Sequence, residues 1–487
     1  MDFISTRNHS IKIGGSAAIV KGISDDGGLF VPSSFPSLEK ADWDKLLESN
    51  YAERAALVMS KYLTDFTYDE LLDVCNKAYS KFDGDPAPLV KTGEDDYVLE
   101  LWHGPTSAFK DIALTVLPYL LTLSKKKLGI NDKTLILVAT SGDTGKAALE
   151  GFSDVEGVEI IVFYPHNGVS RMQELQMCTT KGNNVHVSAL KGNFDDAQTA
   201  VKTIFTSDSA KAELKAMGYD LSSANSINFG RLVPQVAYYI SAYCDLVNAG
   251  EIEFGDKITY SVPCGNFGNI LAAYYAMRMG LPVRKLICAS NMNNILCDFI
   301  STGVYDIRRE FHKTVSPSMD ILISSNLERF LFELDGRDDN ALKTKMQALK
   351  DAGVYRISDE QLAKMREIFD CGWCDEKSTA TTINEYFEDT GYCLDPHTAV
   401  AVAVNDSVAE GKTVTVSTAS PYKFPTVVYK ALTGKSVDDA FVASDKLEEY
   451  TAESQPTSLT ELKTLPVRHD TVCEREDIFE TVKNFLK

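Results

Sequence analysis

From about residue 96 onward, the chain alternates short apolar runs rich in β-branched residues with longer stretches of helical periodicity. This alternation limits the possible folds strongly, because strands that are apolar on both faces need helices on both sides of their sheet. The pattern predicts an α/β protein with parallel sheets. The predicted strands are 134–139, 158–164, 185–190, 258–262, 285–289 and 413–417, separated by helices such as 170–181, 195–207 and 231–249.

The rest of the chain differs from this alternating part. Residues 1–95 are predicted to be mostly helical, with a linker at 84–88, and the stretch from about 335 to 410 is predicted to be a helical insertion without strands. A chain of 487 residues predicts about three structural units at roughly 150 residues each. We expect an N-terminal domain (1–95), a large domain (96–130 and 220–435), a small α/β domain (131–219) and a C-terminal extension (436–487).

Charge and cysteine usage exclude several function classes. The 49 Lys and Arg against 69 Asp and Glu give a net charge of −20, which argues against nucleic acid or an anionic membrane as a partner but allows a local basic pocket. No apolar run approaches the roughly 20 residues of a membrane span, and residues 1–5 do not resemble a signal peptide. The 10 cysteines lack framework spacing, so we expect reduced thiols and a cytoplasmic protein, either monomeric or homodimeric.

The histidine spacing and one cysteine motif bear on metal and redox chemistry. The histidines show no metal-ligand spacing, so no catalytic metal is predicted. Cys371-Gly372-Trp373-Cys374 has the spacing of a redox motif, but it follows a predicted helix instead of opening one after a strand. A redox role for this motif is therefore not favoured.

Two predicted strands lead into glycine-rich turns that open helices. The first turn is 141–145 (SGDTG) and the second is 264–269 (CGNFGN). Glycines let backbone N–H groups converge, and a helix start adds positive potential, so both turns are candidate anion cradles at the carboxyl ends of strands. Neither turn matches a Walker A loop or a GxGxxG fingerprint. Two such turns in one protein would suit a phosphorylated cofactor together with a small acid.

A third segment, 101–111, places Lys110 at the start of a predicted helix. A helix start disfavours a cation, so this placement predicts a lowered pKa for the Lys110 amine and a better nucleophile. The alternative is a solvated lysine beside Asp111.

The ordered motifs of the chain resemble the threonine synthases of the long bacterial and fungal form, within the pyridoxal-phosphate enzymes of fold type II. The resemblance covers most of the chain. It rests on 21–32 (KGISDDGGLFVP), 103–106 (HGPT), 109–111 (FKD), 141–145 (SGDTG), 225–228 (NSIN), 265–269 (GNFGN) and 318–320 (SMD).

The resemblance implies two parallel-sheet domains of the tryptophan synthase β-like kind and pyridoxal 5′-phosphate as the cofactor. Lys110 would hold the cofactor covalently and shuttle protons, and Asp143 would lie near the ring hydroxyl. Thr418 would hydrogen-bond the pyridine nitrogen, where a neutral hydroxyl disfavours transamination chemistry. The cofactor phosphate would be bound by Gly265, Asn266, Phe267, Gly268 and Asn269, and the substrate carboxylate by Ser141, Gly142 and Thr144.

The substrate phosphate needs cationic and amide donors, and the candidates are Arg171, Asn225, Ser226 and Arg231. Arg171 is equally well explained as a surface arginine. His397 also fits a family pattern, but a capping or packing role is the favoured interpretation. One motif departs from the family, which usually has Thr-Ala-His-Pro-Ala-Lys-Phe where this chain has 418–424 (TASPYKF).

The resemblance implies conversion of O-phospho-L-homoserine and water to L-threonine and phosphate. A threonine-synthase-like phospho-lyase is the nearest alternative, and the changes at Ser420 and Tyr422 keep it open. A serine/threonine dehydratase of the same fold type, or a non-catalytic cofactor-binding protein, is disfavoured by the N-terminal segment and by the intact Lys110.

Overall fold

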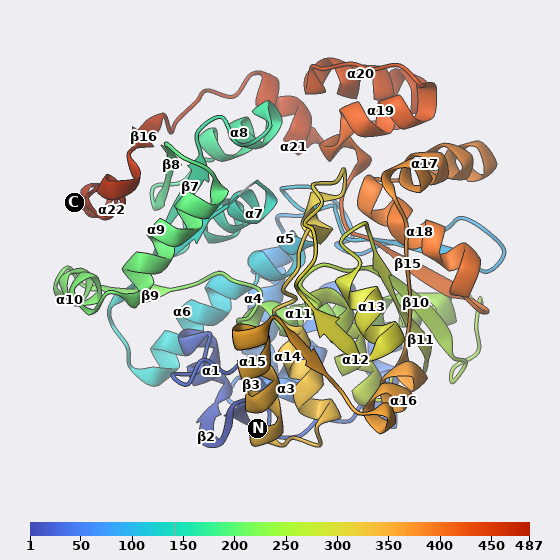
Figure 1. Cartoon of the computed structure of the whole chain (residues 1–487), viewed down its shortest axis with the longest axis horizontal. Helices are drawn as coiled ribbons and strands as arrows, with labels where there is room; N and C mark the ends of the chain where they lie inside the picture. Colours follow the sequence, from blue (N-terminus) through green and yellow to red (C-terminus); the bar gives the residue numbers. More distant parts are fainter. Residues whose placement is uncertain (141) are drawn as a thin grey trace.

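The computed structural model describes residues 1–140 and 142–487, and two parallel sheets form its centre (Figure 1). The larger sheet has the order β14-β11-β10-β15-β5-β4, in which only β4 is antiparallel to its neighbour. Its strands are β4 (Leu89–Lys91), β5 (Asp96–Glu100), β10 (Ile258–Pro263), β11 (Val283–Ser290), β14 (Phe369–Trp373) and β15 (Thr413–Ser417).

The smaller sheet has the order β16-β8-β7-β6-β9, and all of its strands are parallel. β16 comes from the C-terminal segment, which runs back across the molecule to pair with β8 (Figure 1). This pairing was not anticipated from the sequence. The strands are β6 (Lys133–Ala139), β7 (Val158–Pro165), β8 (Val185–Leu190), β9 (Tyr219–Ser222) and β16 (Thr471–Cys473).

One expectation about the regions outside the sheets needs an addition and another needs correction. The N-terminal region has four helices, as expected, and also begins with a small antiparallel sheet of order β2-β1-β3. The predicted helical insertion contains β13, which pairs with β12, and β14, which extends the large sheet. The bounds of these strands are β1 (Asp2–Ser5), β2 (Asn8–Gly14), β3 (Phe30–Pro32), β12 (Val304–Asp306) and β13 (Val354–Arg356).

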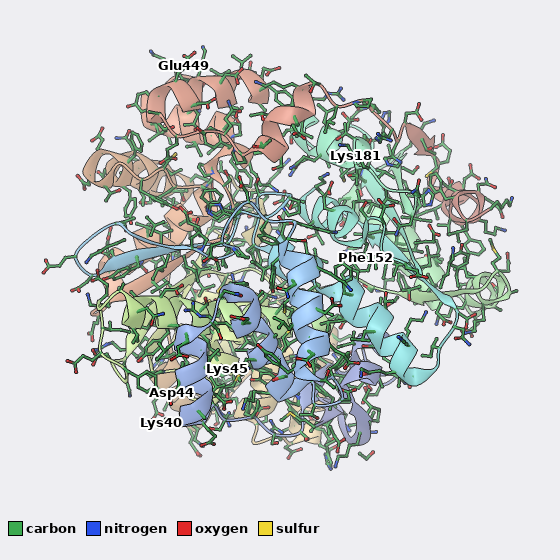
Figure 2. All side chains as sticks on the ribbon, turned by 180° about the vertical axis from the view of Figure 1, so that it is seen from behind. Lys40, Asp44, Lys45, Phe152, Lys181 and Glu449 are labelled. Carbon is green, nitrogen blue, oxygen red and sulfur yellow. The ribbon has the colours of Figure 1, made fainter. Side chains whose placement is uncertain are left out.

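Helices cover both sheets and build the N-terminal region. In α2, Trp43 and Leu46 face inward, while Lys40, Asp44 and Lys45 face solvent (Figure 2). The helices up to residue 249 are α1 (Gly15–Lys21), α2 (Lys40–Glu48), α3 (Tyr51–Tyr62), α4 (Tyr68–Tyr79), α5 (Lys110–Leu114), α6 (Leu117–Leu128), α7 (Asp143–Phe152), α8 (Arg171–Cys178), α9 (Phe194–Thr206), α10 (Asp208–Ala216) and α11 (Phe229–Asn248).

The later helices surround the large sheet and form the C-terminal segment. Short 3-10 turns lie at Pro317–Met319, Pro421–Lys423, Glu461–Lys463 and Arg475–Asp477. The helices are α12 (Gly268–Arg278), α13 (Ile295–Thr302), α14 (Leu327–Leu334), α15 (Asp339–Ala352), α16 (Asp359–Ile368), α17 (Glu376–Thr390), α18 (Pro396–Val408), α19 (Pro425–Thr433), α20 (Ala440–Thr451), α21 (Thr457–Thr460) and α22 (Ile478–Phe485).

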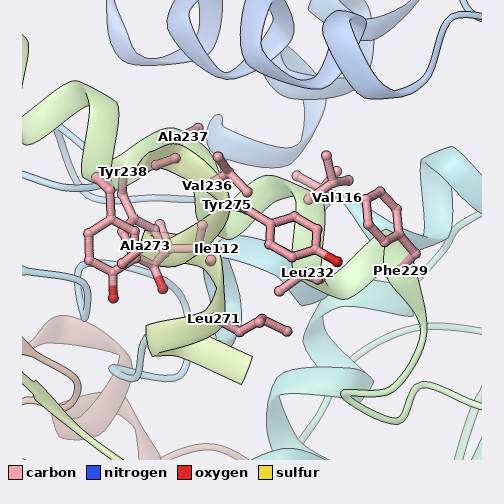
Figure 3. Packing of buried hydrophobic residues seen from close by; sticks show 14 of the residues in the cluster. Ile112, Val116, Phe229, Leu232, Val236, Ala237, Tyr238, Leu271, Ala273 and Tyr275 are labelled. Atoms are coloured by element: carbon pink, nitrogen blue, oxygen red, sulfur yellow. The ribbon is translucent and has the colours of Figure 1, made fainter. Parts of the chain in front are cut away.

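The core is centred on α11, a 20-residue helix that is almost entirely buried. Its side chains Phe229, Leu232 and Val236 pack with residues of α12 such as Leu271 and Tyr275 (Figure 3). A helix buried on all sides must be apolar all round, and α11 meets this requirement over most of its length. This packing fixes α12, whose first residues form part of the candidate site. No helix in the described residues is long and apolar enough to cross a membrane.

Candidate active site

A cavity of about 600 Å³ lies between the two sheets, at the carboxyl ends of β6 and β10. This is where ligands bind in α/β proteins, because strand ends feed the starts of helices there. Its volume lies within the range typical of small-molecule and cofactor sites. The cavity is lined by Lys110, Thr144, the 263–270 segment, Ser318, His397 and Thr418, among other residues.

Lys110 is the first residue of α5, and its amine points into this cavity. Nζ donates a hydrogen bond to Ser318 Oγ at 3.0 Å and lies 3.9 Å from Asp143 Oδ2. Burial lowers the pKa of Lys110 to about 8; Asp143 opposes this shift, while Lys423 and Arg231 add to it. The predicted direction of the pKa shift is confirmed, but its main cause is burial and not the start of a five-residue helix.

The loop before Lys110 is held by Asp111, which is fully buried. Asp111 accepts hydrogen bonds from the Thr106 N–H at 2.8 Å and from the Thr106 hydroxyl at 2.6 Å. A side chain at Gly104 would collide with Asp111, because a Cβ there would lie 2.5 Å from the Asp111 Cβ. Asp111 thus positions the Lys110 segment, and Lys110 is not the solvated lysine of the alternative interpretation.

The second glycine turn brings an unpaired side-chain donor to the cavity at the start of α12. Gly265 packs directly under the 318 backbone, since a Cβ there would lie 2.5 Å from the Ser318 carbonyl oxygen. Asn269 is buried, and its Oδ1 accepts from Tyr238 and from Tyr239, the latter at 2.7 Å. Its Nδ2 has no hydrogen-bond partner among the described residues. A helix start with free donors suits a phosphate, so the loop fits a phosphorylated cofactor.

The first glycine turn contributes less to the cavity than predicted. Thr144 lines it, but Gly142 does not; Gly142 packs against Gln173, whose Nε2 would lie 2.4 Å from a Cβ at this position. The Thr140 hydroxyl holds the turn by accepting from the N–H groups of Gly142 and Gly145 at 3.0 and 3.1 Å. Ser141 lies outside the described residues.

Asp143 pairs with a lysine that sequence reasoning did not single out. Lys423 Nζ lies 3.0 Å from Asp143 Oδ1 and also donates to the Thr106 carbonyl at 2.9 Å. Burial by itself would raise the pKa of Asp143, but Lys423 and Lys110 outweigh it and hold this pKa far below its usual range. Asp143 is therefore a fixed negative charge beside Lys110. The available signal was the position of Lys423 within the 418–424 motif.

His397 lies against the cavity, so the packing-or-capping interpretation understates its position. Its Nε2 accepts the Ser318 N–H at 3.2 Å, and its Nδ1 lies 2.8 Å from the buried Asp395 carboxylate. These partners require a proton on Nδ1 and a free lone pair on Nε2. The His397–Asp395 pair thus holds the Ser318 backbone, and the Ser318 hydroxyl in turn accepts a hydrogen bond from the Lys110 amine. Thr418 lines the same cavity.

Three of the four predicted phosphate ligands line the cavity: Asn225, Ser226 and Arg231. Arg231 is buried and donates to the Ala224 carbonyl at 2.8 Å, while its Nε has no partner among the described residues. Burial lowers the pKa of Arg231 to about 10. Arg171 does not join them in this structure: its side chain is 64 % exposed, pairs with Glu174 at 2.7 Å and does not line the cavity.

A buried lysine at a helix start, facing a glycine-rich phosphate cradle between two α/β sheets, defines a pyridoxal-phosphate-dependent enzyme of fold type II. The family model described as "Pyridoxal-phosphate dependent enzyme" matches residues 86–419. Residues 2–79 match "Threonine synthase N terminus", and residues 398–485 match "Threonine synthase, C-terminal". The chain belongs to the threonine synthase family, whose cofactor is pyridoxal 5′-phosphate.

Relatives and solved structures agree with this placement. Threonine synthase of Pseudomonas aeruginosa is 39 % identical, over 90 % of this chain and 91 % of its own length. Human threonine synthase-like 1 is 40 % identical over 94 % of this chain, which spans only 62 % of that relative. The structure of PLP-bound threonine synthase from Brucella melitensis superposes with a TM-score of 0.90 at 36 % identity, covering 100 % of both chains. Yeast threonine synthase gives 0.89 at 32 % identity, covering 99 % and 97 %.

The lowered pKa of Lys110 predicts the pH dependence of cofactor attachment. Only the neutral amine adds to an aldehyde, so the rate constant for covalent attachment should rise about tenfold per pH unit and level off near pH 8. Stopped-flow absorbance of cofactor-free protein mixed with pyridoxal phosphate, between about pH 6 and 10, measures this rate constant. A rise that continues beyond about pH 9.5 would show that the Lys110 pKa is not lowered. Lys110→Ala, which lacks the amine, is the control and should show no covalent phase.

Proposed function

We propose that the protein is a threonine synthase, converting O-phospho-L-homoserine and water to L-threonine and phosphate. The observation that carries this proposal is a second anion-binding region in the cavity that holds Lys110. The 265–269 loop supplies donors for the cofactor phosphate, while the buried Arg231, with an unpaired Nε, remains for a phosphate on the substrate.

Lys110 is the proposed general base and acid. With a pKa near 8, its amine can take a proton from the substrate and return one close to neutral pH. Ser318 Oγ accepts a hydrogen bond from this amine and thereby orients Nζ for proton transfer. When bound, the cofactor supplies the electron sink that stabilises negative charge on the substrate carbons.

The remaining roles are those that the resemblance to the threonine synthases implies. Thr418 is proposed to hydrogen-bond the cofactor ring nitrogen and Asp143 to lie near the ring hydroxyl, with its charge balanced by Lys423. Thr144 and Ser141 are proposed to bind the substrate carboxylate. Asn225, Ser226 and Arg231 are proposed to hold the substrate phosphate, so that the bonds to be broken are aligned before reaction.

Several broader assignments are part of the same proposal. The free state of the 10 cysteines supports a cytoplasmic location, and the net charge of −20 supports a protein that binds no nucleic acid. We expect a monomer or a homodimer. The division into 1–95, 96–130 with 220–435, 131–219 and 436–487 is kept as a proposal, with the addition that β16 of the last segment belongs with the small sheet.

A phospho-lyase that releases phosphate, ammonia and 2-oxobutanoate is the second candidate. It is favoured by the altered 418–424 motif. Ser420 and Tyr422 are both buried away from the cavity lining, and the Tyr422 hydroxyl donates to the Glu453 carbonyl. Their influence on the product would therefore be indirect, and this supports the synthase.

The deciding experiment follows both products of the purified holoenzyme supplied with O-phospho-L-homoserine. Equal amounts of phosphate and threonine are expected for the synthase. Phosphate with 2-oxobutanoate and ammonia would replace the synthase assignment with the phospho-lyase. No release of phosphate would overturn both assignments.

Replacing Arg231 with methionine should raise KM for the phosphorylated substrate by about 10- to 100-fold. A charge-assisted hydrogen bond contributes about 1.5–3 kcal/mol, and about 1.4 kcal/mol is a factor of ten. Steady-state kinetics measure KM for the substrate, and a cofactor titration separately measures the affinity for the cofactor. Arg171→Ala is the matched control: the exposed Arg171 side chain should leave KM unchanged. An Arg231→Met variant with weakened cofactor binding and unchanged KM would reassign Arg231 to the cofactor phosphate.

A further inference from the structure

Two cysteine thiols meet at the edge of the large sheet, away from the cavity. Cys297 of α13 and Cys371 of β14 lie with their Sγ atoms 3.4 Å apart. β14 is an edge strand of its sheet, and neither residue lines the cavity. The 3.4 Å separation means that a modest movement would bring the two sulfur atoms to bonding distance.

Cys371 is also the accessible thiol of the chain. Of the 10 cysteines, all of which lie in the described residues, nine are buried and Cys371 alone is partly exposed. The exposed Ser301 places its hydroxyl oxygen 3.3 Å from Cys371 Sγ. A small reagent can therefore reach Cys371 from solvent, whereas Cys297 lies behind it.

The surroundings of the pair favour a thiolate on Cys371. The hydrogen bond from Cys297 is the largest cause and lowers the pKa of Cys371 to about 7; burial opposes this shift, and Ser301 adds to it. Among charged neighbours, Asp370 raises this pKa and Arg366 lowers it. The pKa of Cys297 is raised in turn, by the Cys371 contact, by burial and by Asp298. A partly exposed thiol of lowered pKa beside a buried thiol of raised pKa is the arrangement of an attacking and a resolving cysteine.

The partner of Cys371 is not the one suggested by the sequence. Cys374 is buried on the other side, where its Sγ contacts the Thr379 hydroxyl of α17 at 3.3 Å. The Cys371-Gly372-Trp373-Cys374 spacing therefore does not bring these two thiols together. The functional pair joins Cys371 to a cysteine 74 positions earlier in the chain.

We propose that Cys297 and Cys371 form a reversible dithiol–disulfide site that reacts with small disulfides such as oxidised glutathione. The Cys371 thiolate attacks one sulfur of the reagent, the reagent's S–S bond breaks, and one glutathione leaves as thiolate. Cys297 then gives its proton to solvent and attacks Cys371 Sγ, which expels the second glutathione. Two protein thiols are oxidised to one disulfide, and one glutathione disulfide is reduced to two thiols. This site is independent of the proposed function.

The test treats the full-length holoenzyme with oxidised glutathione near pH 7.5, blocks the remaining thiols with N-ethylmaleimide and maps the peptides by mass spectrometry. The expected product is a single link between Cys297 and Cys371 that dithiothreitol reverses. Iodoacetamide should alkylate Cys371 of the reduced protein at least about tenfold faster than any other cysteine. Absence of the link, or a link between Cys371 and another cysteine, would overturn the proposal.

Three variants separate the roles of the thiols. Cys297→Ser should accumulate a glutathione adduct on Cys371, because the resolving thiol is missing, and Cys371→Ser should form neither adduct nor link. Cys374→Ser is the matched control and should form the same Cys297–Cys371 link as the unchanged protein. If Cys374→Ser abolished the link, or if Cys297→Ser formed no adduct on Cys371, the assignment of the pair would be wrong.

Discussion

Lys110→Ala is expected to lower kcat by at least about 10³-fold and to remove the absorbance band of covalently attached cofactor. General acid–base catalysis by one side chain contributes about 10²- to 10⁴-fold, and Lys110 is proposed to act in more than one proton transfer. In the cavity the Lys110 amine lies 3.0 Å from Ser318 Oγ. Among the described residues, Lys202 of α9 is the one other lysine that lines the cavity. Steady-state kinetics and an absorbance spectrum of the purified variant measure both effects.

A stability measurement separates catalysis from folding in this variant. Burial disfavours the charged amine of Lys110, so its removal should not lower the free energy of unfolding of the cofactor-free protein. Lys77→Ala is the matched control, because Lys77 is exposed on α4 and pairs with Asp73, and its removal should leave activity unchanged. Turnover within about tenfold of the unchanged enzyme would remove Lys110 from the mechanism.

Gly265→Ala is expected to raise the dissociation constant of the cofactor by about 10- to 100-fold. The added Cβ would lie 2.5 Å from the Ser318 carbonyl oxygen, which is backbone and cannot rotate away. Overpacking of this kind costs about 1–3 kcal/mol. Here it would displace both the 265–269 loop and Ser318, whose hydroxyl accepts a hydrogen bond from Lys110. Cofactor titration of the cofactor-free variant measures the loss, and kcat at saturating cofactor reports the effect on Ser318.

Gly268→Ala is the comparison for Gly265→Ala. It lies in the same loop, but its added Cβ would meet the side-chain Nδ2 of Asn326 at 3.2 Å, and a side chain can adjust by a few tenths of an ångström. Cofactor binding should therefore be weakened less in Gly268→Ala than in Gly265→Ala. Equal losses would mean that glycine flexibility in the loop, and not the contact with Ser318, is what the site requires.

Features that depend on neighbouring residues could be predicted from the sequence. The apolar runs predicted β8 and β15 to the residue and the other predicted strands to within two residues at either end. Glycine spacing located the two turns that open α7 and α12, and the 101–111 segment placed Lys110 at a helix start. These features are local, because strand periodicity and the backbone freedom of glycine act within a few residues.

Which charged residues face the cavity depends on the packing of distant elements and could not be predicted from the sequence. Arg171 and Arg231 are equivalent cations in the sequence, but the packing of α11 buries Arg231 while α8 leaves Arg171 in solvent. The ion pair of Asp143 with Lys423, the contact of Cys297 with Cys371 and the pairing of β16 with β8 all join segments far apart in the chain. Such contacts arise from burial and from the meeting of distant elements, and burial also sets the pKa of Lys110. Local sequence patterns therefore predict neither burial nor the contacts between distant elements.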